Sequence, residues 1–290
     1  NGMSERVRVR RMEANLLLSL HARPLARFDY TDIDPFGTPA PFIDTVARAT
    51  KRDGMVALTA TDMAPLCGVN VRACIRKYGS TSLRTGYSHE SALRILIGSF
   101  IRGAAIHEVA SKPVFSFFAD HYIRLYMLLD RGKMRVDKSL REIGYLLNCS
   151  ACKSIRSEKS GLDDRMRICE VCGSEMKAAG PLWLGNLADD DFCLDMIECS
   201  KDSFIGSNRR LINIIRKVRG EIDMPPGFFV LDELSSNLGV ASRRLNPVID
   251  GLRNAGFKAA VSHANNRGLK TDASVEAVKR IVLELNVKGV

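Results

Sequence analysis

The strongest local constraint on this fold is a set of four cysteines arranged as two C-x2-C pairs. Cys149 and Cys152 form the first pair, sixteen residues follow, and Cys169 and Cys172 form the second pair. Each C-x2-C segment turns tightly and presents two sulfurs to one tetrahedral metal ion. Gly173 follows the second pair directly, at a position where such a turn needs backbone freedom. The spacing therefore predicts a structural zinc site with four thiolate ligands and no open position for chemistry.

Composition favours a large globular protein with a polyanionic partner. The chain has 290 residues, of which 46% are hydrophobic, so it can bury a sizeable core and is expected to contain two domains. Lysine and arginine number 43 against 33 acidic residues, and this net charge of +10 suits a nucleic acid, although a basic surface can also serve solubility. No apolar run is long enough to span a membrane, and no secretory signal is visible. We therefore expect a cytoplasmic, monomeric protein with reduced thiols, which favours zinc over two disulfides.

The second informative stretch is a strand that ends abruptly. Residues 28–33 alternate bulky and acidic side chains, as a β-strand does, and the chain then reads Asp34-Pro35-Phe36-Gly37. Proline has no N–H for a ladder and glycine allows unusual dihedral angles, so the strand should end in a tight loop. In open α/β sheets, ligands bind at the carboxyl ends of strands. This loop is therefore a candidate binding site.

The loop suits a flat ring that carries an amine. The Asp34 carboxylate and the Pro35 carbonyl oxygen could accept hydrogen bonds from an exocyclic NH2 group, and Phe36 could stack on the ring. Two such acceptors would turn the amine lone pair toward an incoming methyl group, and in-line positioning can lower the barrier by several kcal/mol. Taken alone, the four residues favour a simpler interpretation, namely a strand–turn–helix with an acidic helix cap.

Six segments, spread over nearly the whole chain, carry a specific pattern. They are DIDPFGTPAPFIDTVARA (32–49), TATDMAPLCG (59–68), YSHESALRILIG (87–98), DHYIRLY (120–126), GPLWLGNL (180–187) and GLKTDA (268–273). In this order they resemble the tRNA guanine-26 N2-dimethyltransferase family. The resemblance implies a Rossmann-like class I methyltransferase fold, S-adenosylmethionine as methyl donor, and guanine 26 of tRNA as acceptor, methylated once or twice on N2. It makes Asp34 the candidate catalytic residue and Pro35, Phe36 and Gly37 the candidate base-binding residues, which the guanine would reach by leaving its stack.

The amino-terminal part departs from that family. We expect one helix, Ser4–Leu20, with Ser4 as its N-cap, and no glycine-rich turn of the kind that wraps a methyl donor. The family has an acidic residue after the asparagine that matches Asn1, and an aspartate before the alanine that matches Ala22. This chain has Gly2 and His21 at those places. Ala22 is therefore the one donor-binding residue that we assign, and we expect the methyltransferase domain to be amino-terminally incomplete and this chain alone to be inactive.

The following segments complete an α/β domain. The expected elements are a helix over 40–49, a buried strand over 55–61, a buried helix over 89–108 and a strand over 115–129. Asp62, at the end of the second strand, could either bind a ligand or hold a turn. The last strand interleaves aromatic and basic side chains, which could clamp nucleic acid or could equally be half-buried sheet residues.

The C-terminal third predicts a winged-helix-like module. A helix over 204–220, rich in lysine and arginine, precedes a Pro-Pro-Gly break. Helical patterns over 231–238 and 241–255, separated by a turn at Gly239, have helix–turn–helix spacing, and a small strand pair or wing follows. Pro247 should kink or shorten the second of these helices. The candidates for contact with tRNA phosphates are Arg209, Arg210, Arg243, Arg244 and Lys270, and a charged face kept for solubility is the alternative.

Together these features predict an α/β, Rossmann-like methyltransferase domain followed by a C-terminal α+β domain with a zinc ribbon and a winged-helix-like module. We expect the catalytic domain over 1–130, the zinc ribbon over 131–185 and the tRNA-binding domain over 186–290. The predicted function is mono- and dimethylation of the N2 amine of guanine 26 in tRNA. The alternative is a zinc-ribbon, winged-helix RNA-binding protein that has lost catalysis.

Overall fold

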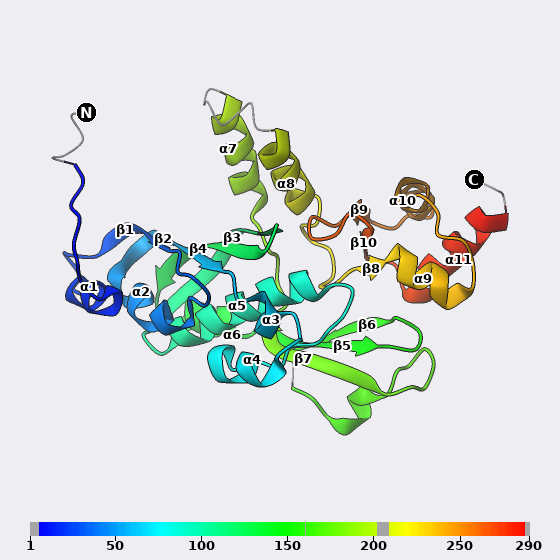
Figure 1. The fold of residues 1–290 in the computed structure, drawn as a ribbon, viewed down its shortest axis with the longest axis horizontal. Helices are drawn as coiled ribbons and strands as arrows, with labels where there is room; N and C mark the ends of the chain where they lie inside the picture. Colours follow the sequence, from blue (N-terminus) through cyan, green and yellow to red (C-terminus); the bar gives the residue numbers. More distant parts are fainter. Residues whose placement is uncertain (1–5, 160, 202–208, 288–290) are drawn as a thin grey trace.

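The structure is a computed structural model that describes residues 6–159, 161–201 and 209–287. Its strands are β1 (Phe28–Ile33), β2 (Thr50–Ala60), β3 (Val109–Ala119), β4 (Tyr122–Arg131), β5 (Ile143–Cys149), β6 (Ile155–Glu158), β7 (Met176–Trp183), β8 (Phe229–Val230), β9 (Ala259–Val261) and β10 (Gly268–Thr271). Its helices are α1 (Ala14–Leu20), α2 (Ile43–Ala49), α3 (Met63–Leu66), α4 (Val71–Tyr78), α5 (Ser88–Ala105), α6 (Lys133–Leu140), α7 (Asp190–Lys201), α8 (Arg209–Arg219), α9 (Leu231–Leu238), α10 (Leu245–Asn254) and α11 (Val275–Val287). Two 3-10 turns are η1 (Ala40–Phe42) and η2 (Asp164–Arg167). Within the described ranges, the strands form three separate sheets (Figure 1).

The first sheet has the strand order β1-β2-β4-β3. β1 and β2 are parallel and are connected through α2, whereas β3 and β4 form an antiparallel hairpin whose second strand pairs with β2. A parallel pair of strands joined by a helix is the repeating unit of Rossmann-like sheets. The structure therefore confirms the predicted α/β, Rossmann-like fold.

Helices cover both faces of this sheet. On one face, α5 is buried along most of its length, as its apolar sequence predicts. Leu96 and Phe100 of α5 belong to one core with Val46 of α2 and with Leu58 and Ile123 of the strands. On the other face, the α7–α8 hairpin packs against β3 and stands out from the rest of the molecule (Figure 1).

The amino-terminal helix is shorter than predicted. Ser4 lies outside the described residues, and residues 6–13 are exposed and are not helical. α1 begins directly after Glu13, whose side chain accepts hydrogen bonds from Asn15 N and Leu16 N at 2.9 and 2.8 Å. A side-chain acceptor at this position satisfies the first free N–H groups of a helix, so the helix starts there.

Two strand predictions also need correction. The segment 115–129 is not one strand, because the chain reverses at Asp120 between β3 and β4. Asp120 has a φ of +52°, a left-handed conformation that aspartate tolerates in turns. β2 begins at Thr50, directly after α2, and not near residue 55. The buried part of the predicted second strand is nonetheless present within β2.

The winged-helix-like module consists of the sheet β8-β10-β9 and the helices α9, α10 and α11, which share one hydrophobic core. α9 ends at Gly239, whose φ of +67° makes the predicted turn. α10 begins at Leu245 and not at residue 241, and Pro247 lies in its first turn, where a missing N–H has no helical partner to lose. The prediction that Pro247 shortens this helix is confirmed. α8 covers the described part of the predicted helix, whose residues 204–208 lie outside it.

Apart from Arg131, the last residue of β4, each sheet falls within one of the three predicted segments of the chain. However, α7 and α8, which belong to the third segment, pack against β3 of the first. The exact domain boundaries therefore stay a prediction. Within the described ranges, no helix combines the length and the apolar character that crossing a membrane requires.

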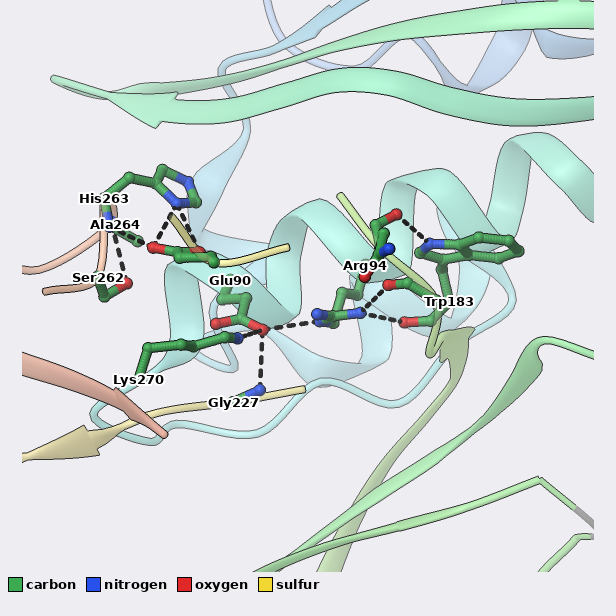
Figure 2. A network of polar contacts seen from close by, with 11 residues as sticks. Glu90, Arg94, Trp183, Gly227, Ser262, His263, Ala264 and Lys270 are labelled. Atoms are coloured by element: carbon green, nitrogen blue, oxygen red, sulfur yellow. Dashed lines mark hydrogen bonds and ion pairs between the residues drawn. The ribbon is translucent and has the colours of Figure 1, made fainter. Parts of the chain in front are cut away.

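A buried ion-pair cluster joins α5 to the winged-helix-like module (Figure 2). Glu90 Oε1 accepts hydrogen bonds from Arg94 Nε at 2.8 Å, from Lys270 Nζ at 2.6 Å and from Gly227 N at 2.8 Å. Glu90 is 0% exposed, Arg94 2% and Lys270 1%. Burial alone would raise the pKa of Glu90, but the charges of Lys270 and Arg94 outweigh it and lower the pKa to about 2. Because a buried charge is destabilising without its partner, this cluster holds α5 and the winged-helix-like module together.

A second buried pair lies beside the first. His263 Nδ1 is 3.0 Å from both carboxylate oxygens of Glu221, and the main-chain N of His263 donates to the same carboxylate. Arg94 Nη1 also donates to the carbonyl oxygens of Trp183 and Gly185, at 3.0 and 2.9 Å. Together, the Glu90 cluster and the Glu221–His263 pair connect α5, the end of β7, the segment after α8 and the loop between β9 and β10 (Figure 2).

Candidate functional site

The DPFG loop, residues 34–37, follows β1 at the carboxyl edge of the first sheet and lies against the loop that follows β2. Gly37 N donates to Thr61 Oγ1 at 2.9 Å, and Thr61 N donates to Gly37 O at 2.9 Å. Gly37 has a φ of +107°, which residues with a side chain rarely adopt. These hydrogen bonds hold the loops after the two parallel strands side by side, which is the usual place for a ligand in an α/β sheet.

The predicted functional side chains of this loop are exposed. Phe36 is fully exposed, and the exposed Asp34 side chain makes no hydrogen bond or ion pair with any described residue. A free carboxylate is an acceptor for an amine, and an exposed aromatic ring offers a stacking face. The loop therefore presents to solvent the two groups that an amine-bearing base would need.

Asp62, at the end of β2, has both carboxylate oxygens engaged. Tyr78 Oη donates to Oδ1 at 2.6 Å, and Lys77 Nζ donates to Oδ2 at 2.9 Å. Thr38 Oγ1 lies 2.7 Å from Tyr78 Oη, which links this cluster to the residue that follows the DPFG loop. Burial and the Asp62 carboxylate raise the pKa of Tyr78, so its phenol stays a donor. Of the two roles left open for Asp62, the geometry supports the structural one.

Arg124, on β4, is bound within the sheet. Its Nη1 and Nη2 atoms donate to Asp32 at 3.1 and 2.6 Å. Its Nη1 also donates to Thr59 Oγ1 at 2.6 Å and its Nε to Tyr126 Oη at 2.9 Å. Tyr30 Oη donates to Asp32 at 3.1 Å, and burial together with the Asp32 charge raises the pKa of Tyr30 to about 12. These partnerships support half-buried sheet residues as the interpretation of the interleaved pattern.

Ala22 lies at the opposite edge of the sheet from the DPFG loop. The neighbouring His21 stacks on Phe28, the first residue of β1, with ring centroids 4.5 Å apart. β1 has six residues, and six strand residues span about 20 Å, so Ala22 is a strand length away from Asp34. This placement does not support the assignment of Ala22 to donor binding, because ligands of α/β sheets bind at the carboxyl edge. Gly2, the other departure from the family, lies outside the described residues.

Glu13 is a carboxylate that sequence reasoning missed. The first residues of α1 lie beside the start of α2, which follows the DPFG loop, and α1 packs against α2. Thr45 Oγ1, in the first turn of α2 after the DPFG loop, donates to Asn15 Oδ1 at 2.6 Å, which agrees with this placement. Hydrogen bonds from the backbone N–H groups of Asn15 and Leu16 lower the pKa of Glu13. The available signal was an acidic residue directly before a helical pattern.

The four predicted zinc ligands lie together. Their sulfur atoms are all within 4.8 Å of one another, with 3.5 Å between Cys149 and Cys172 and between Cys152 and Cys169. None of the four forms a disulfide. A zinc ion about 2.3 Å from each of four sulfurs would space them about 3.8 Å apart, so the cluster has the dimensions that the ion requires.

The two C-x2-C turns have the same backbone geometry. Lys153 N donates to Cys149 O at 3.0 Å, and Gly173 N donates to Cys169 O at 2.8 Å. Lys153 and Gly173 have φ values of +70° and +72°, so the glycine occupies the left-handed position that the sequence suggested. Two matching turns that bring their sulfurs together are suited to sharing one ion.

The predicted tRNA contacts have different environments. They are Arg209, Arg210, Arg243, Arg244 and Lys270. Arg209 and Arg244 are exposed, and Arg210 is exposed but paired with Asp120 at 2.5 Å. Arg243 is half-buried and donates to Asn286 Oδ1 at 3.1 Å. Lys270 is buried against Glu90, so the prediction that it contacts phosphates is wrong.

The sheet, with its ligand loop at the carboxyl edge, defines a Rossmann-like methyltransferase domain of class I. The cysteine cluster and the winged-helix-like module are appended to this domain. Residues 1–283 match the sequence profile of the N2,N2-dimethylguanosine tRNA methyltransferases, and the chain belongs to this family.

Individual similar proteins support membership of this family. A tRNA (guanine(26)-N(2))-dimethyltransferase from Methanothermobacter thermautotrophicus is 38% identical over 259 residues, which cover 89% of this chain and 68% of the relative. A relative of the same name from Methanosarcina mazei is 36% identical over 287 residues, covering 99% and 72%. The solved structure of Trm1 from Pyrococcus horikoshii with S-adenosyl-L-methionine matches with a TM-score of 0.85 at 30% identity, covering 94% of this chain and 70% of that one. The family and the fold indicated by the sequence motifs are confirmed.

Proposed function

We propose that the protein is a tRNA (guanine26-N2)-dimethyltransferase, which transfers one or two methyl groups from S-adenosylmethionine to the N2 amine of guanine 26. The observation that carries this proposal is the DPFG loop, held at the carboxyl edge of a Rossmann-like sheet in a chain of this family. The S-adenosyl-L-methionine in the similar Pyrococcus horikoshii structure supports the choice of donor. An RNA-binding protein without catalysis would not need an unpartnered aspartate beside an exposed aromatic ring at this edge.

In this proposal, the DPFG loop receives the guanine base. Asp34 and the Pro35 carbonyl oxygen accept hydrogen bonds from the N2 amine, and Phe36 stacks on the flipped base. Gly37 keeps the loop against its neighbour through the two hydrogen bonds to Thr61. Leaving the base stack requires a few kcal/mol, which stacking on Phe36 partly offsets. When N2 bonds to the methyl carbon it loses a proton, and Asp34 is the group proposed to accept it.

We further propose that Cys149, Cys152, Cys169 and Cys172 hold one structural zinc ion. Four thiolates complete a tetrahedral site, so the ion would tie the two turns together and take no part in methyl transfer. The reduced thiols that this requires are expected in the cytoplasm, where tRNA is also available.

For tRNA binding, we propose phosphate contacts from the exposed arginines of α8 and the α9–α10 region. Arg209, Arg210 and Arg244 are exposed, and the chain carries a net charge of +10. Phosphate contacts of this kind position an RNA without reading its sequence. We propose a monomer, because the loop, the cysteine cluster and these arginines all come from one chain.

The test is nucleoside analysis of tRNA from cells that lack the full-length gene, with and without complementation. We expect both N2-methylguanosine and N2,N2-dimethylguanosine to be missing at position 26 and to return with the wild-type gene. A gene that carries Asp34→Asn should not restore them, although the protein accumulates to the same level. Unchanged nucleosides in the deletion strain would contradict the proposed function and would favour an RNA-binding protein without catalysis.

A further inference from the structure

A partly open pocket of about 310 Å³ lies where the methyltransferase domain, the cysteine segment and the winged-helix-like module meet. Its walls come from residues 84–87 before α5, from residues 148–155 around the first C-x2-C turn, and from residues 228–234 at the start of the winged-helix-like module. None of the DPFG residues lines it. Its volume is at the lower end of the range for small-ligand sites, which suits one flat ring with a substituent and not a duplex.

Aromatic rings and unsatisfied hydroxyl groups line this junction pocket. Tyr87 and Phe228 lie edge to face with ring centroids 6.3 Å apart, and Phe229 is a further lining residue. The hydroxyls of Tyr87 and Thr85 are buried, and neither has a partner among the described residues apart from the other. Two hydroxyls that have only each other leave hydrogen-bonding capacity unused. Buried groups of this kind call for a partner, and a ligand in the pocket would supply one.

The charges at the pocket favour an anion. Arg84 is exposed at the wall and forms no side-chain hydrogen bond or ion pair with any described residue. Lys153 and Glu233 both line the pocket and pair with each other at 3.5 Å, so they largely cancel. An unpaired guanidinium beside aromatic rings is a combination that binds a phosphate next to a base.

The pocket wall is attached to the carboxyl edge of the first sheet. Ser82 Oγ donates to Pro65 O, in the short helix that follows β2, at 2.6 Å. At Gly68, just after that helix, a Cβ atom would lie 2.3 Å from Arg84 N, so the two segments are in direct contact. The segment that carries Arg84 is therefore fixed to the segment that follows β2, whose first residue, Thr61, is hydrogen-bonded to Gly37 of the DPFG loop.

We propose that this junction pocket binds one unstacked nucleotide of the RNA substrate other than the target base, with the base against Tyr87 and Phe228 and its phosphate on Arg84. The proposal rests on the proposed function only in taking RNA as the substrate. Its role is to fix the position of the RNA relative to all three modules, because each module contributes a wall.

The test uses an unmodified tRNA transcript and three variants of the chain. Arg84→Ala removes the proposed phosphate contact, Tyr87→Phe removes one hydroxyl and keeps the ring, and Arg141→Ala is the control. Arg141 is exposed, does not line the junction pocket and forms no side-chain hydrogen bond or ion pair with a described residue. Fluorescence anisotropy at several salt concentrations measures binding. Crosslinking of a transcript that contains 4-thiouridine, followed by mass spectrometry, locates the contact.

We expect Arg84→Ala to weaken binding about tenfold and to reduce the slope of log affinity against log salt by about one. Tyr87→Phe should weaken binding a few-fold without changing that slope, because it removes no charge. Arg141→Ala should bind within about twofold of wild type, and crosslinked peptides should include residues 84–87 or 228–230. Wild-type affinity in both pocket variants, or crosslinks that all lie outside these residues, would overturn the proposal.

The same experiment separates this proposal from the proposed function. Weaker binding in the pocket variants supports the pocket whether or not position 26 is methylated. Intact methylation together with unchanged binding overturns the pocket and leaves the function standing. Thermal unfolding within about 2 °C of wild type shows that each variant is folded, and Tyr87→Phe retains the buried ring for this reason.

Discussion

Two aspartates follow the two parallel strands of the catalytic sheet, and their neighbours give them different roles. Asp62 has one oxygen on Tyr78 and the other on Lys77, so it is fully used inside the protein. Asp34 is exposed and has no partner among the described residues. A carboxylate in the first situation braces a loop, whereas one in the second can bind a substrate amine.

We predict that Asp34→Asn lowers the methylation rate by about 10²- to 10³-fold, the effect of losing one group that stabilises a transition state. Affinity for tRNA should stay within about twofold, because one acceptor to a base adds little to binding dominated by phosphates. Single-turnover methylation and tRNA binding are measured on the same full-length enzyme. Asp137→Asn, an exposed aspartate on α6, is the control, and activity of Asp34→Asn within a few-fold of this control would contradict the role.

Tyr78→Phe tests the structural role of Asp62. The substitution removes the phenol that donates to Asp62 Oδ1 and contacts Thr38 Oγ1, and leaves a half-buried acceptor without its partner. We predict a loss of about 1–3 kcal/mol in the free energy of unfolding, measured by urea denaturation. Thr38→Ala, which keeps the bond between Tyr78 and Asp62, should lose less. Equal stability of wild type and Tyr78→Phe would show that this hydrogen bond does not hold the loops.

At the scale of single elements, the cysteine segment cannot hold itself together by burial. The buried apolar residues around the sulfurs are few, chiefly Leu147 and Met176, and η2 between the two turns buries none of its residues. Small elements of this kind are usually stabilised by a metal. The stability of the two C-x2-C turns should therefore depend on the zinc ion more than the stability of the rest of the fold does.

We predict about one zinc ion per chain, lost in Cys149→Ser and in Cys172→Ser. Cys199→Ser is the matched control, because Cys199 is exposed and lies outside the cluster. Metal content is measured by plasma mass spectrometry after gel filtration. Equal zinc in wild type and both ligand variants, or none in any of them, would exclude the site.

At the scale of the whole molecule, the winged-helix-like module is not an independent attachment. Its Lys270 supplies a positive charge to Glu90 of α5, 180 residues earlier in the sequence. Excising the module would remove this charge and leave Arg94 as the remaining charged partner of Glu90 in the cluster. Removal of one member of a buried ion pair is strongly destabilising, so a truncated chain is a poor test of RNA binding.

We predict that Glu90→Gln lowers the free energy of unfolding at pH 7 by about 3–5 kcal/mol, because Lys270 and Arg94 lose their buried counter-charge. The pKa of Glu90 is lowered from 4.5 to about 2, so its contribution to stability is complete above pH 4.5 and is lost as the pH falls toward 2. Wild type should therefore lose more stability than Glu90→Gln between pH 4.5 and 2.5. Parallel pH curves of urea unfolding for the two proteins would contradict this assignment.

For the whole molecule, we also predict that tRNA binding is steeply salt-dependent, because the net charge is +10 and phosphate contacts release counterions. Arg209→Ala and Arg244→Ala should each reduce the slope of log affinity against log salt by about one. Lys270 should not behave in this way, since it is buried. The measurement is filter binding between 50 and 200 mM salt. A flat curve for wild type would contradict an electrostatic interface.

Features that depend on neighbouring residues could be predicted from the sequence alone. The cysteine spacing predicted the four-sulfur cluster, and the Asp-Pro-Phe-Gly run predicted where β1 ends. The helix–turn–helix spacing around Gly239 predicted the winged-helix-like module. Turn chemistry and hydrophobic periodicity act over a few residues, so a linear pattern contains the information that determines them.

Features that depend on distant partners were decided only by the tertiary structure. From the sequence, Lys270 was predicted to contact phosphates, but in the folded protein it is paired with Glu90. Ala22 was predicted to bind the donor, but the length of β1 separates it from Asp34. The sequence left a ligand-binding role open for Asp62, but in the structure Tyr78 and Lys77 donate to its two carboxylate oxygens. Burial and ion pairing are set by contacts between segments far apart in the chain, and these contacts exist only in the folded protein.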